Sequence, residues 1–212
     1  MQLNVPFYAN DGDGSQCGQV TVRTAIKYFL NKDLSLQELD KITDRKTGYR
    51  TWTTQMASAL HDFGLKVKYY SKENLEPFLQ GEPFMRKHFG KDAEQILKHT
   101  DMPVLMKSIH TVMEQGIFER KELVLSDIES HLSKGHVPIV CIDWNKTVGR
   151  EGLFAGHYVV ATGFDKENIY YHESGPTNPT ANKKLSKKIF IEAWNANGTD
   201  NDVIIVFGKR KN

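Results

Sequence analysis

The sequence predicts an α+β fold in which helices fill the first half of the chain and a mostly antiparallel sheet fills the second. Apolar residues recur at helical spacing in several segments before position 135, whereas β-branched and aromatic runs separated by Gly, Asp and Asn dominate after it. The chain has 212 residues, of which 39% are hydrophobic and 25% charged, so it can bury a core as one domain. We therefore expect a single domain, 1–212, with a helical lobe at about 9–135 and a sheet lobe at about 136–212.

A loop of glycine and small polar residues, Ala9–Ser15, precedes the first expected helix, which begins near Cys17. The run Ser35-Leu36-Gln37-Glu38 has the pattern of a capping box, in which the serine and glutamate side chains each accept a backbone hydrogen bond at a helix start. The other elements expected before position 72 are a second helix at about Ser35–Thr43, a third at Thr53–Phe63 that ends before Gly64, and a short strand at Leu65–Tyr70.

The segment from about 72 to 123 is expected to form a helical insertion. Proline and glycine interrupt its apolar patterns, so several short helices are expected instead of one long helix. The helical stretches predicted in it are Glu73–Leu79, Ala93–Leu97 and Val104–Phe118. Two alternatives stay open: the apolar residues of the insertion pack as a cap beside a cleft, or they enlarge the helical core.

The second half begins after a helix that is capped at about Ser126 and stops at Gly135. Strand composition follows, because β-branched and aromatic residues are concentrated there between turn residues. The strands predicted are Val137–Ile142, Tyr158–Phe164, Asn168–His172 and Val203–Phe207, and one helix, Ser186–Trp194, interrupts them. The first lobe thus carries a thiol, Cys17, and the second carries an imidazole, His157.

Cys17 and His157 are the first candidates for chemistry. A thiolate is the reactive form of cysteine, and both a helix N-terminus and a nearby imidazolium lower the pKa of a thiol from about 8.5. Cys17 is expected at a helix start in Gln16-Cys17-Gly18-Gln19, and His157 opens a strand in Gly156-His157-Tyr158. The alternative for a lone cysteine, an inert small apolar residue in the core, fits Cys141 within an apolar strand better.

These motifs, in this order, resemble the papain-like cysteine peptidases, and most of all the double-glycine-leader (bacteriocin-processing) peptidases and their stand-alone relatives. The residues that carry the resemblance are Val5-Pro6-Phe7, Cys17-Gly18, the run from Gly156 to Asp165, Ile169-Tyr170-Tyr171 and the run from Phe190 to Trp194. It covers both ends of the chain and leaves the insertion at 72–123 without a counterpart. It implies a papain-like fold, with Cys17 as nucleophile and His157 as general base and acid.

The resemblance also implies a third residue that orients the imidazole by accepting a hydrogen bond from its other ring nitrogen. Glu173 stands at that position, at the end of the strand after His157, where the family carries Asp or Asn. A glutamate is one methylene longer and can still accept the bond. His172 and Asp165 are lesser candidates, and Asp165 is better explained as a turn residue.

The donor to the oxyanion is atypical as well. The family uses a Gln about six residues before the Cys, and Asp11 stands there, whose negative charge would repel a developing oxyanion. We therefore predict that Asn10 and the backbone N–H of Cys17 form the oxyanion site, with Gln16 as the next candidate.

Composition excludes several other classes of protein. Lys and Arg exceed Asp and Glu only by 28 to 26, so no nucleic-acid partner is expected. No apolar run is long enough for a membrane span, and the N-terminus lacks the pattern of a signal peptide. The 2 cysteines do not make a disulfide framework, so a reducing, cytoplasmic location is expected. No Cys-x-x-Cys or His-Glu-x-x-His is present, and neither a metal nor another cofactor is predicted.

The sequence therefore predicts a cysteine peptidase or a related amide hydrolase that acts on a peptide or protein through a thioester. Two alternatives stay open. An acyltransferase, as in transglutaminase-like relatives, would use the same residues with an amine in place of water. A catalytically silent module that binds peptides would account for the atypical third and oxyanion positions. Nothing in the sequence indicates an oligomeric state.

Overall fold

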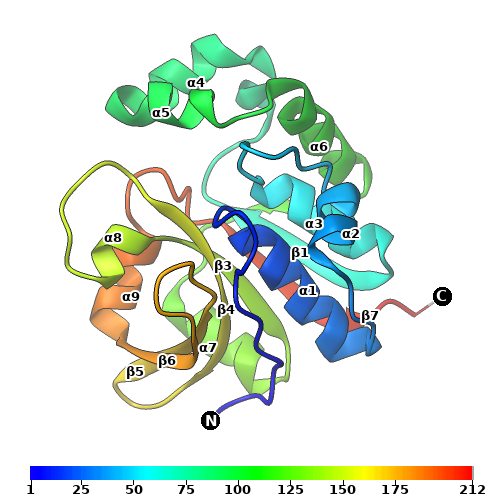
Figure 1. The fold of residues 1–212 in the computed structure, drawn as a ribbon, viewed down its shortest axis with the longest axis vertical. Coiled ribbons are helices and arrows are strands. Elements are labelled where there is room, and N and C mark those ends of the chain that lie inside the picture. The colour runs from blue at the N-terminus through cyan, green and yellow to red at the C-terminus, as the bar shows by residue number, and fades with distance from the viewer. Residues whose placement is uncertain (212) are drawn as a thin grey trace.

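The computed structural model describes residues 1–211, and a seven-stranded sheet of order β2-β1-β7-β3-β4-β5-β6 runs through them (Figure 1). Neighbouring strands are antiparallel except for β1 and β2, which are parallel. The strands are β1 Leu65–Ser71, β2 Phe118–Arg120, β3 Val137–Asp143, β4 Gly156–Phe164, β5 Asn168–Glu173, β6 Thr180–Ser186 and β7 Val203–Lys209. The prediction of an α+β fold with a mostly antiparallel sheet is confirmed.

Helices cover both faces of this sheet. The helices are α1 Cys17–Leu30, α2 Leu36–Ile42, α3 Thr53–Asp62, α4 Glu82–Phe89, α5 Ala93–Lys98, α6 Met102–Glu114, α7 Leu125–Ser133, α8 Trp144–Thr147 and α9 Lys187–Trp194, with short 3₁₀ turns at Glu76–Gln80 and Gly90–Asp92. One apolar cluster joins α1 and α3 to one face, and a second cluster joins α7 and α9 to the other. Every residue of β3 is buried as a result, which explains why its sequence is apolar from Val137 to Ile142.

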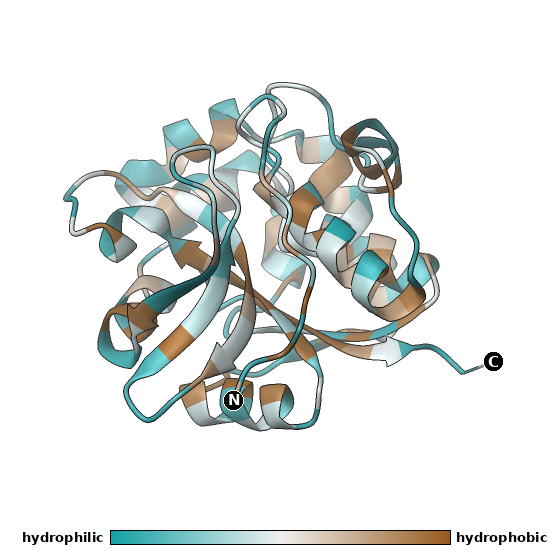
Figure 2. Cartoon of the chain, turned by 60° about the horizontal axis from the view of Figure 1, so that its bottom comes forward, coloured by the Kyte–Doolittle hydropathy of each residue, from teal (hydrophilic) through white to brown (hydrophobic). Residues whose placement is uncertain are grey.

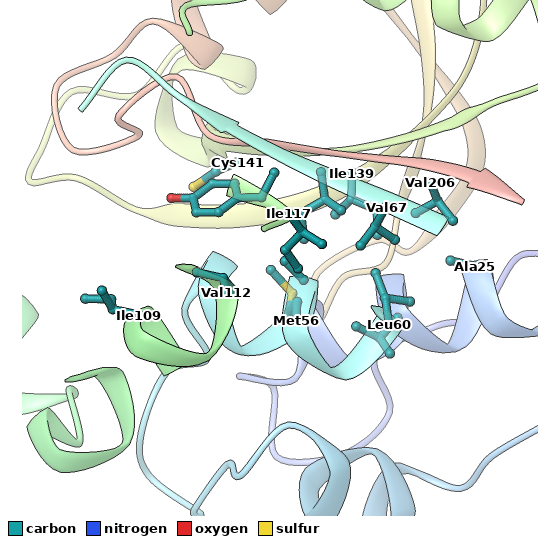
Figure 3. Packing of buried hydrophobic residues seen from close by; sticks show 14 of the residues in the cluster. Ala25, Met56, Leu60, Val67, Ile109, Val112, Ile117, Ile139, Cys141 and Val206 are labelled. Carbon is teal, nitrogen blue, oxygen red and sulfur yellow. The ribbon is translucent and has the colours of Figure 1, made fainter. Parts of the chain in front are cut away.

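Helix α3 packs directly beneath the sheet. Met56 and Leu60 of this helix point toward Val67, Ile139 and Val206 on three neighbouring strands (Figure 3). All five side chains are buried, so they exclude water from the space between helix and sheet. Along the chain as a whole, apolar residues recur on strands and helix faces, while loops and the chain ends are mostly hydrophilic (Figure 2).

Several predicted elements are confirmed with close boundaries. Helix α1 begins at Cys17, and the capping box of α2 is present, with the Ser35 and Glu38 side chains each accepting a backbone N–H bond. Ser186 caps α9 by accepting from the backbone N–H of Ile189. These starts were predictable because each depends on residues within one helical turn.

Other elements correct the prediction. The expected helix Val104–Phe118 ends at Glu114, and Phe118 begins strand β2. The helix expected to be capped at Ser126 begins at Leu125, where the Asp127 carboxylate accepts from the backbone N–H of Val124. Strand β6 was not predicted because it is a polar, largely exposed edge strand with two lysines, and it lacks apolar alternation. Helix α4 and the short helix α8 are also missing from the prediction. The prediction did not include the pairing that brings β1 and β2, from the first half of the chain, into the same sheet as the later strands.

The insertion at 72–123 is part of the core. Met85 and Phe89 of α4 and Leu105 of α6 are buried in the same apolar cluster as Met56 and Leu60 of α3. Figure 1 shows α4 and α5 projecting at the top of the molecule, on the same side as α8. Among residues 1–211, no helix combines the length and apolar content needed to cross a membrane.

The burial of α4 gives a stability prediction. Met85 is fully buried, so Met85→Ala should lower the free energy of unfolding by about 2–5 kcal/mol through lost contacts and a residual cavity. Met113→Ala is the matched control, because this methionine is 39% exposed and its truncation should change stability by no more than about 0.5 kcal/mol. Urea unfolding measures both values. A loss of stability in Met85→Ala as small as the one expected for Met113→Ala would show that α4 contributes little to the core.

Candidate active site

A cleft of about 500 Å³ lies where the start of α1 meets β4. Aromatic side chains make much of its wall, among them Trp52, Phe89, Trp144 and Phe154. The insertion contributes to it as well, since Phe89 of α4 and Ile96 of α5 line the same space. The Asp92 carboxylate accepts a 3.4 Å bond from the backbone N–H of Phe154, which ties the insertion to the opposite wall. The insertion therefore adds to the core and borders the cleft.

Cys17 is the first residue of α1 and lines this cleft, half-buried. Gly18 explains how the helix start can lie so deep. A Cβ atom at this position would stand 2.8 Å from the Met56 sulfur, so a glycine lets the first turn of α1 approach α3 this closely without displacing the Met56 side chain. The thiol is thus placed at the positive end of a helix of 14 residues, beside the sheet.

His157 and Glu173 face each other from adjacent strands, β4 and β5. The His157 Nε2 and Glu173 Oε1 atoms are 2.7 Å apart, and the backbone N–H of Gly175 donates to the same oxygen at 3.2 Å. Both side chains are buried. Because Nε2 is used by the carboxylate, Nδ1 is the ring nitrogen left to face Cys17. The structure therefore brings together the three residues that the sequence singled out.

The charges of this group support one another. Burial alone would raise the pKa of the Cys17 thiol, but a hydrogen bond and the charge of His157, with the backbone N–H groups of Tyr158 and Gly18, lower it overall. Burial opposes a charged His157, yet the bonds to Cys17 and Glu173 raise its pKa to about 10. Both shifts favour the thiolate and the imidazolium over the neutral thiol and imidazole.

Glu173 completes the charge pattern. Burial would raise the pKa of its carboxyl, but His157, the Gly175 N–H and Lys183 lower it overall. The Lys183 Nζ atom is 3.6 Å from Glu173 Oε2. The carboxylate therefore stays ionised at neutral pH and accepts from the imidazolium.

The two side chains expected at the oxyanion site differ in their surroundings. The Asn10 side chain is buried, and neither its nitrogen nor its oxygen has a hydrogen-bond partner among residues 1–211. The Gln16 amide is engaged instead, since its Nε2 donates to Asp40 at 2.9 Å and its Oε1 accepts from the backbone N–H of Asp13 at 3.3 Å. An oxyanion role for Gln16 would require the Asp40 bond to break.

The two lesser candidates for the orienting residue, His172 and Asp165, make hydrogen bonds that stabilise the fold. His172 bridges the Val5 carbonyl and the Asn182 backbone N–H through its two ring nitrogens, so it ties β5 to the N-terminal segment and to β6. Asp165 accepts from the backbone N–H groups of Glu167 and Asn168 in the turn between β4 and β5, as expected of a turn residue. Neither contacts the Cys17 group.

Several residues in or beside the cleft were not predicted as site residues from the sequence. The Tyr158 hydroxyl and the Thr53 hydroxyl are 2.9 Å apart, and Thr53 donates to the buried Asp202, whose pKa burial and the charge of Asp200 raise to about 7. Arg50 also lines the cleft. Each lies far from Cys17 in sequence, so only the folded chain reveals the grouping. Within residues 1–211 no group of three or more His, Cys, Asp or Glu side chains is arranged to hold a metal ion.

Comparison with known proteins places the chain by sequence. Residues 13–206 match the model of the guanylylate cyclase family. The chain belongs to this family. One relative, guanylyl cyclase 1 of Arabidopsis thaliana, is 22% identical over 206 residues, which cover 90% of this chain and 71% of the relative. The family by sequence thus carries a different name from the peptidase family that the motifs resemble.

Solved structures similar to this member of the family are peptidase domains. A putative C39-like peptidase from Bacillus anthracis gives a TM-score of 0.59 at 12% identity and covers 98% of this chain and 96% of its own. The peptidase domain of Streptococcus ComA gives 0.51 at 13% identity, with 96% and 97% covered. A double-glycine-motif protease solved with its leader peptide gives 0.51 at 12% identity, with 97% and 93% covered. The expected papain-like fold and the resemblance to double-glycine peptidases are confirmed.

The ion pair predicts how Cys17 reacts with iodoacetamide. Thiolate is present above the lowered pKa of Cys17, and the imidazolium persists up to the His157 pKa of about 10. Alkylation should therefore stay fast well below the ordinary thiol pKa of about 8.5 and decline only as the pH falls through the lowered value. His157→Ala should slow it by roughly tenfold or more at a pH of about 6.5. Mass spectrometry of the labelled peptide gives the rates.

Cys141 supplies the internal control for this measurement. It is buried in the core, and burial raises the pKa of its thiol well above the ordinary value, so it should stay unlabelled in the folded protein. A Cys17 rate that follows the pH dependence of a free model thiol would contradict the ion pair.

Proposed function

We propose that the protein is a cysteine peptidase or a closely related amide hydrolase. The hydrogen-bonded series from Cys17 through His157 to Glu173 carries the proposal, because a nucleophile and an acid line one cleft and a buried anion orients the acid. The likeness of the fold to peptidase domains supports it.

The first half of the reaction forms a thioester. The Cys17 sulfur attacks the carbonyl carbon of a bound amide, and the carbonyl oxygen takes the negative charge. His157 then donates its Nδ1 proton to the amide nitrogen as the C–N bond breaks, so that a neutral amine leaves. Because His157 is already protonated at neutral pH, it is ready to act as this acid.

The second half uses water. After the amine leaves, His157 is neutral and accepts a proton from a water molecule as the water oxygen attacks the thioester carbon. The C–S bond breaks, the acid product leaves, and the thiolate and imidazolium are restored. Glu173 holds the ring in place through both halves by accepting the Nε2 hydrogen bond.

We assign the oxyanion role to Asn10 together with the backbone N–H of Cys17. Asn10 is favoured over Gln16 because its buried amide has no partner, whereas the Gln16 amide donates to Asp40. A buried amide without a hydrogen bond costs free energy, which a transient oxyanion could offset. Asn10 does not line the cleft, so this role requires its amide to turn toward Cys17 when the substrate binds.

We propose a peptide or protein as the substrate. The leader peptide bound to the double-glycine-motif protease of the same fold supports this choice. Both cysteines are free, and a reactive thiolate is easily oxidised, so we place the enzyme in the reducing cytoplasm.

A second candidate is a nucleotide cyclase. The family match and the Arabidopsis thaliana relative favour it. Cyclisation of a nucleoside triphosphate needs a base that removes a ribose hydroxyl proton, and the imidazole that faces the cleft is held protonated with a pKa of about 10. The site is therefore better matched to a thiolate nucleophile than to removal of a hydroxyl proton.

Glu173 gives a test of the orienting role. Glu173→Ala should lower kcat by roughly a hundredfold with a smaller effect on KM, because the ring loses its acceptor. Glu173→Gln should keep part of the activity through its side-chain carbonyl. Glu167→Ala, an exposed glutamate in the turn before β5, is the control and should behave like the unmodified protein. Loss of activity in Glu167→Ala equal to that in Glu173→Ala would contradict the assignment.

A peptide library tests the function itself. We expect cleavage products from the unmodified protein and none from Cys17→Ala. Mass spectrometry of the unmodified protein should also detect a thioester intermediate on Cys17. GTP is incubated in parallel. Formation of a cyclic nucleotide that survives Cys17→Ala would favour the cyclase, a product joined to an added amine would indicate an acyltransferase, and peptide binding without turnover would indicate a silent module.

A further inference from the structure

Arg50 is held in the cleft by its backbone. It lies in the loop between α2 and α3, and its backbone N–H donates to the His99 carbonyl at 2.8 Å. Its side chain lines the same cleft as Cys17 and His157. The Nε atom is buried and has no hydrogen-bond partner among residues 1–211.

No side-chain hydrogen bond or ion pair involves Arg50 among residues 1–211, which sets it apart from the other arginines that the structure describes. Each of the others has a partner: Arg45 pairs with Asp13 and Asp40, Arg23 with Asp33, Arg86 with Glu82 and Glu94, Arg120 with the Lys72 carbonyl, Arg150 with the Trp144 ring, and Arg210 with His61. Arg45 is the closest comparison, because it is buried, its Nε also lacks a partner, and its terminal nitrogens use two carboxylates to offset the charge. Nothing comparable faces Arg50 in the described part of the chain.

The acidic groups of the cleft do not neutralise Arg50. Asp200 pairs with His88 at 3.1 Å, and Asp202 accepts from Tyr69 and Thr53. The charges that act on Arg50 are those of Tyr158, Cys141 and Cys17. Burial keeps the first two neutral by raising their pKa values well above the ordinary range.

The Cys17 thiolate is the remaining anion, and it is already matched. His157 carries the positive charge that balances the thiolate, and Lys183 lies beside Glu173. Arg50 therefore adds a positive charge that the folded chain leaves uncompensated. An arginine stays protonated even when burial lowers its pKa, so a partly buried guanidinium of this kind calls for an anion from outside.

We propose that Arg50 binds a carboxylate of the substrate, so that the enzyme selects peptides with an acidic group near the bond it cleaves. The planar guanidinium can donate two parallel hydrogen bonds to a carboxylate, and aromatic side chains line the same cleft, where a lower local dielectric constant would strengthen such a pair. This inference rests on the proposed hydrolase. A phosphate would offer Arg50 the same oxyanion chemistry, and the experiment separates the two sources.

Two alkylating reagents that differ only in charge test the site without any turnover. In each, the Cys17 thiolate attacks carbon, a C–S bond forms, and the C–I bond breaks to release iodide. Iodoacetate carries a carboxylate and iodoacetamide does not. The rate constant for iodoacetate at Cys17, divided by the rate constant for iodoacetamide, should fall roughly five- to tenfold in Arg50→Gln, because the charge that attracts the carboxylate is gone. Arg50→Lys should keep most of the ratio.

Arg120→Gln is the matched control. It removes one positive charge from an exposed arginine outside the cleft, and the ratio should not change. The His157 imidazolium also attracts iodoacetate, but it is present in every variant, so its effect cancels when the ratios of two variants are compared. An Arg50→Gln ratio equal to that of the unmodified protein would overturn the proposal.

A measurement on the unmodified protein covers the case in which the Arg50 variants do not fold. Acetyl-Ala-Glu-Ala-amide should protect Cys17 from iodoacetamide better than acetyl-Ala-Gln-Ala-amide at equal ionic strength. Equal protection by the two peptides would overturn the proposal. Stronger protection by tripolyphosphate than by the acidic peptide would replace the carboxylate with a phosphate.

The proposed function and this site fail in different ways. A charge-dependent ratio without peptide cleavage would leave the anion site standing and remove the hydrolase and with it the acidic peptide substrate. Cleavage of neutral and acidic peptides at the same rate, with an unchanged ratio in Arg50→Gln, would keep the hydrolase and remove the role of Arg50.

Discussion

The bond between His157 Nε2 and Glu173 Oε1 links two neighbouring strands inside the protein, and the chemistry of the cleft depends on it. Each partner is buried, so each would pay a large desolvation cost as an isolated charge. Together with the Cys17 thiolate they form an alternating series of negative, positive and negative charges, which offsets much of that cost. Removing one member leaves the next one buried without its partner, so the three groups act as a unit.

The fold supplies this series from separate elements. Antiparallel pairing of β4 with β5 sets the two strands side by side, and α1 lies against β4 with its first residue at the cleft. The helix contributes its positive end and the sheet contributes rigid positions, so little conformational freedom is left to the reacting groups. The insertion adds Phe89 and Ile96 to the cleft wall while its other apolar residues stay in the core. The cleft is therefore bordered by segments that also hold the molecule together.

The fold class could be predicted because it depends on local signals, whereas the grouping of Cys17, His157 and Glu173 was expected from the resemblance to papain-like peptidases. A polar loop before a helix, apolar runs in strands and the end of the following strand can each be recognised within a few residues. Arg50 and Asp202 could not be found in this way, because what distinguishes them is burial created by segments far away in the chain. Strand β6 escaped notice because an edge strand exposed to water needs no apolar face. The hydrogen bond from Gln16 to Asp40 likewise depends on how the loop packs against α2.

The close approach of α1 and α3 ties the position of the thiol to a residue of the core. The Met56 sulfur lies next to Gly18 in the first turn of α1, so close that a Cβ atom at position 18 would clash with it. Substitutions at these two positions are consequently interdependent: a smaller side chain at position 56 would make room for a methyl group at position 18, and neither change is neutral alone. Relatives in which position 18 is not glycine are expected to carry a shorter residue on the facing turn of α3, so the pair should covary even though only the thiol next to it takes part in chemistry.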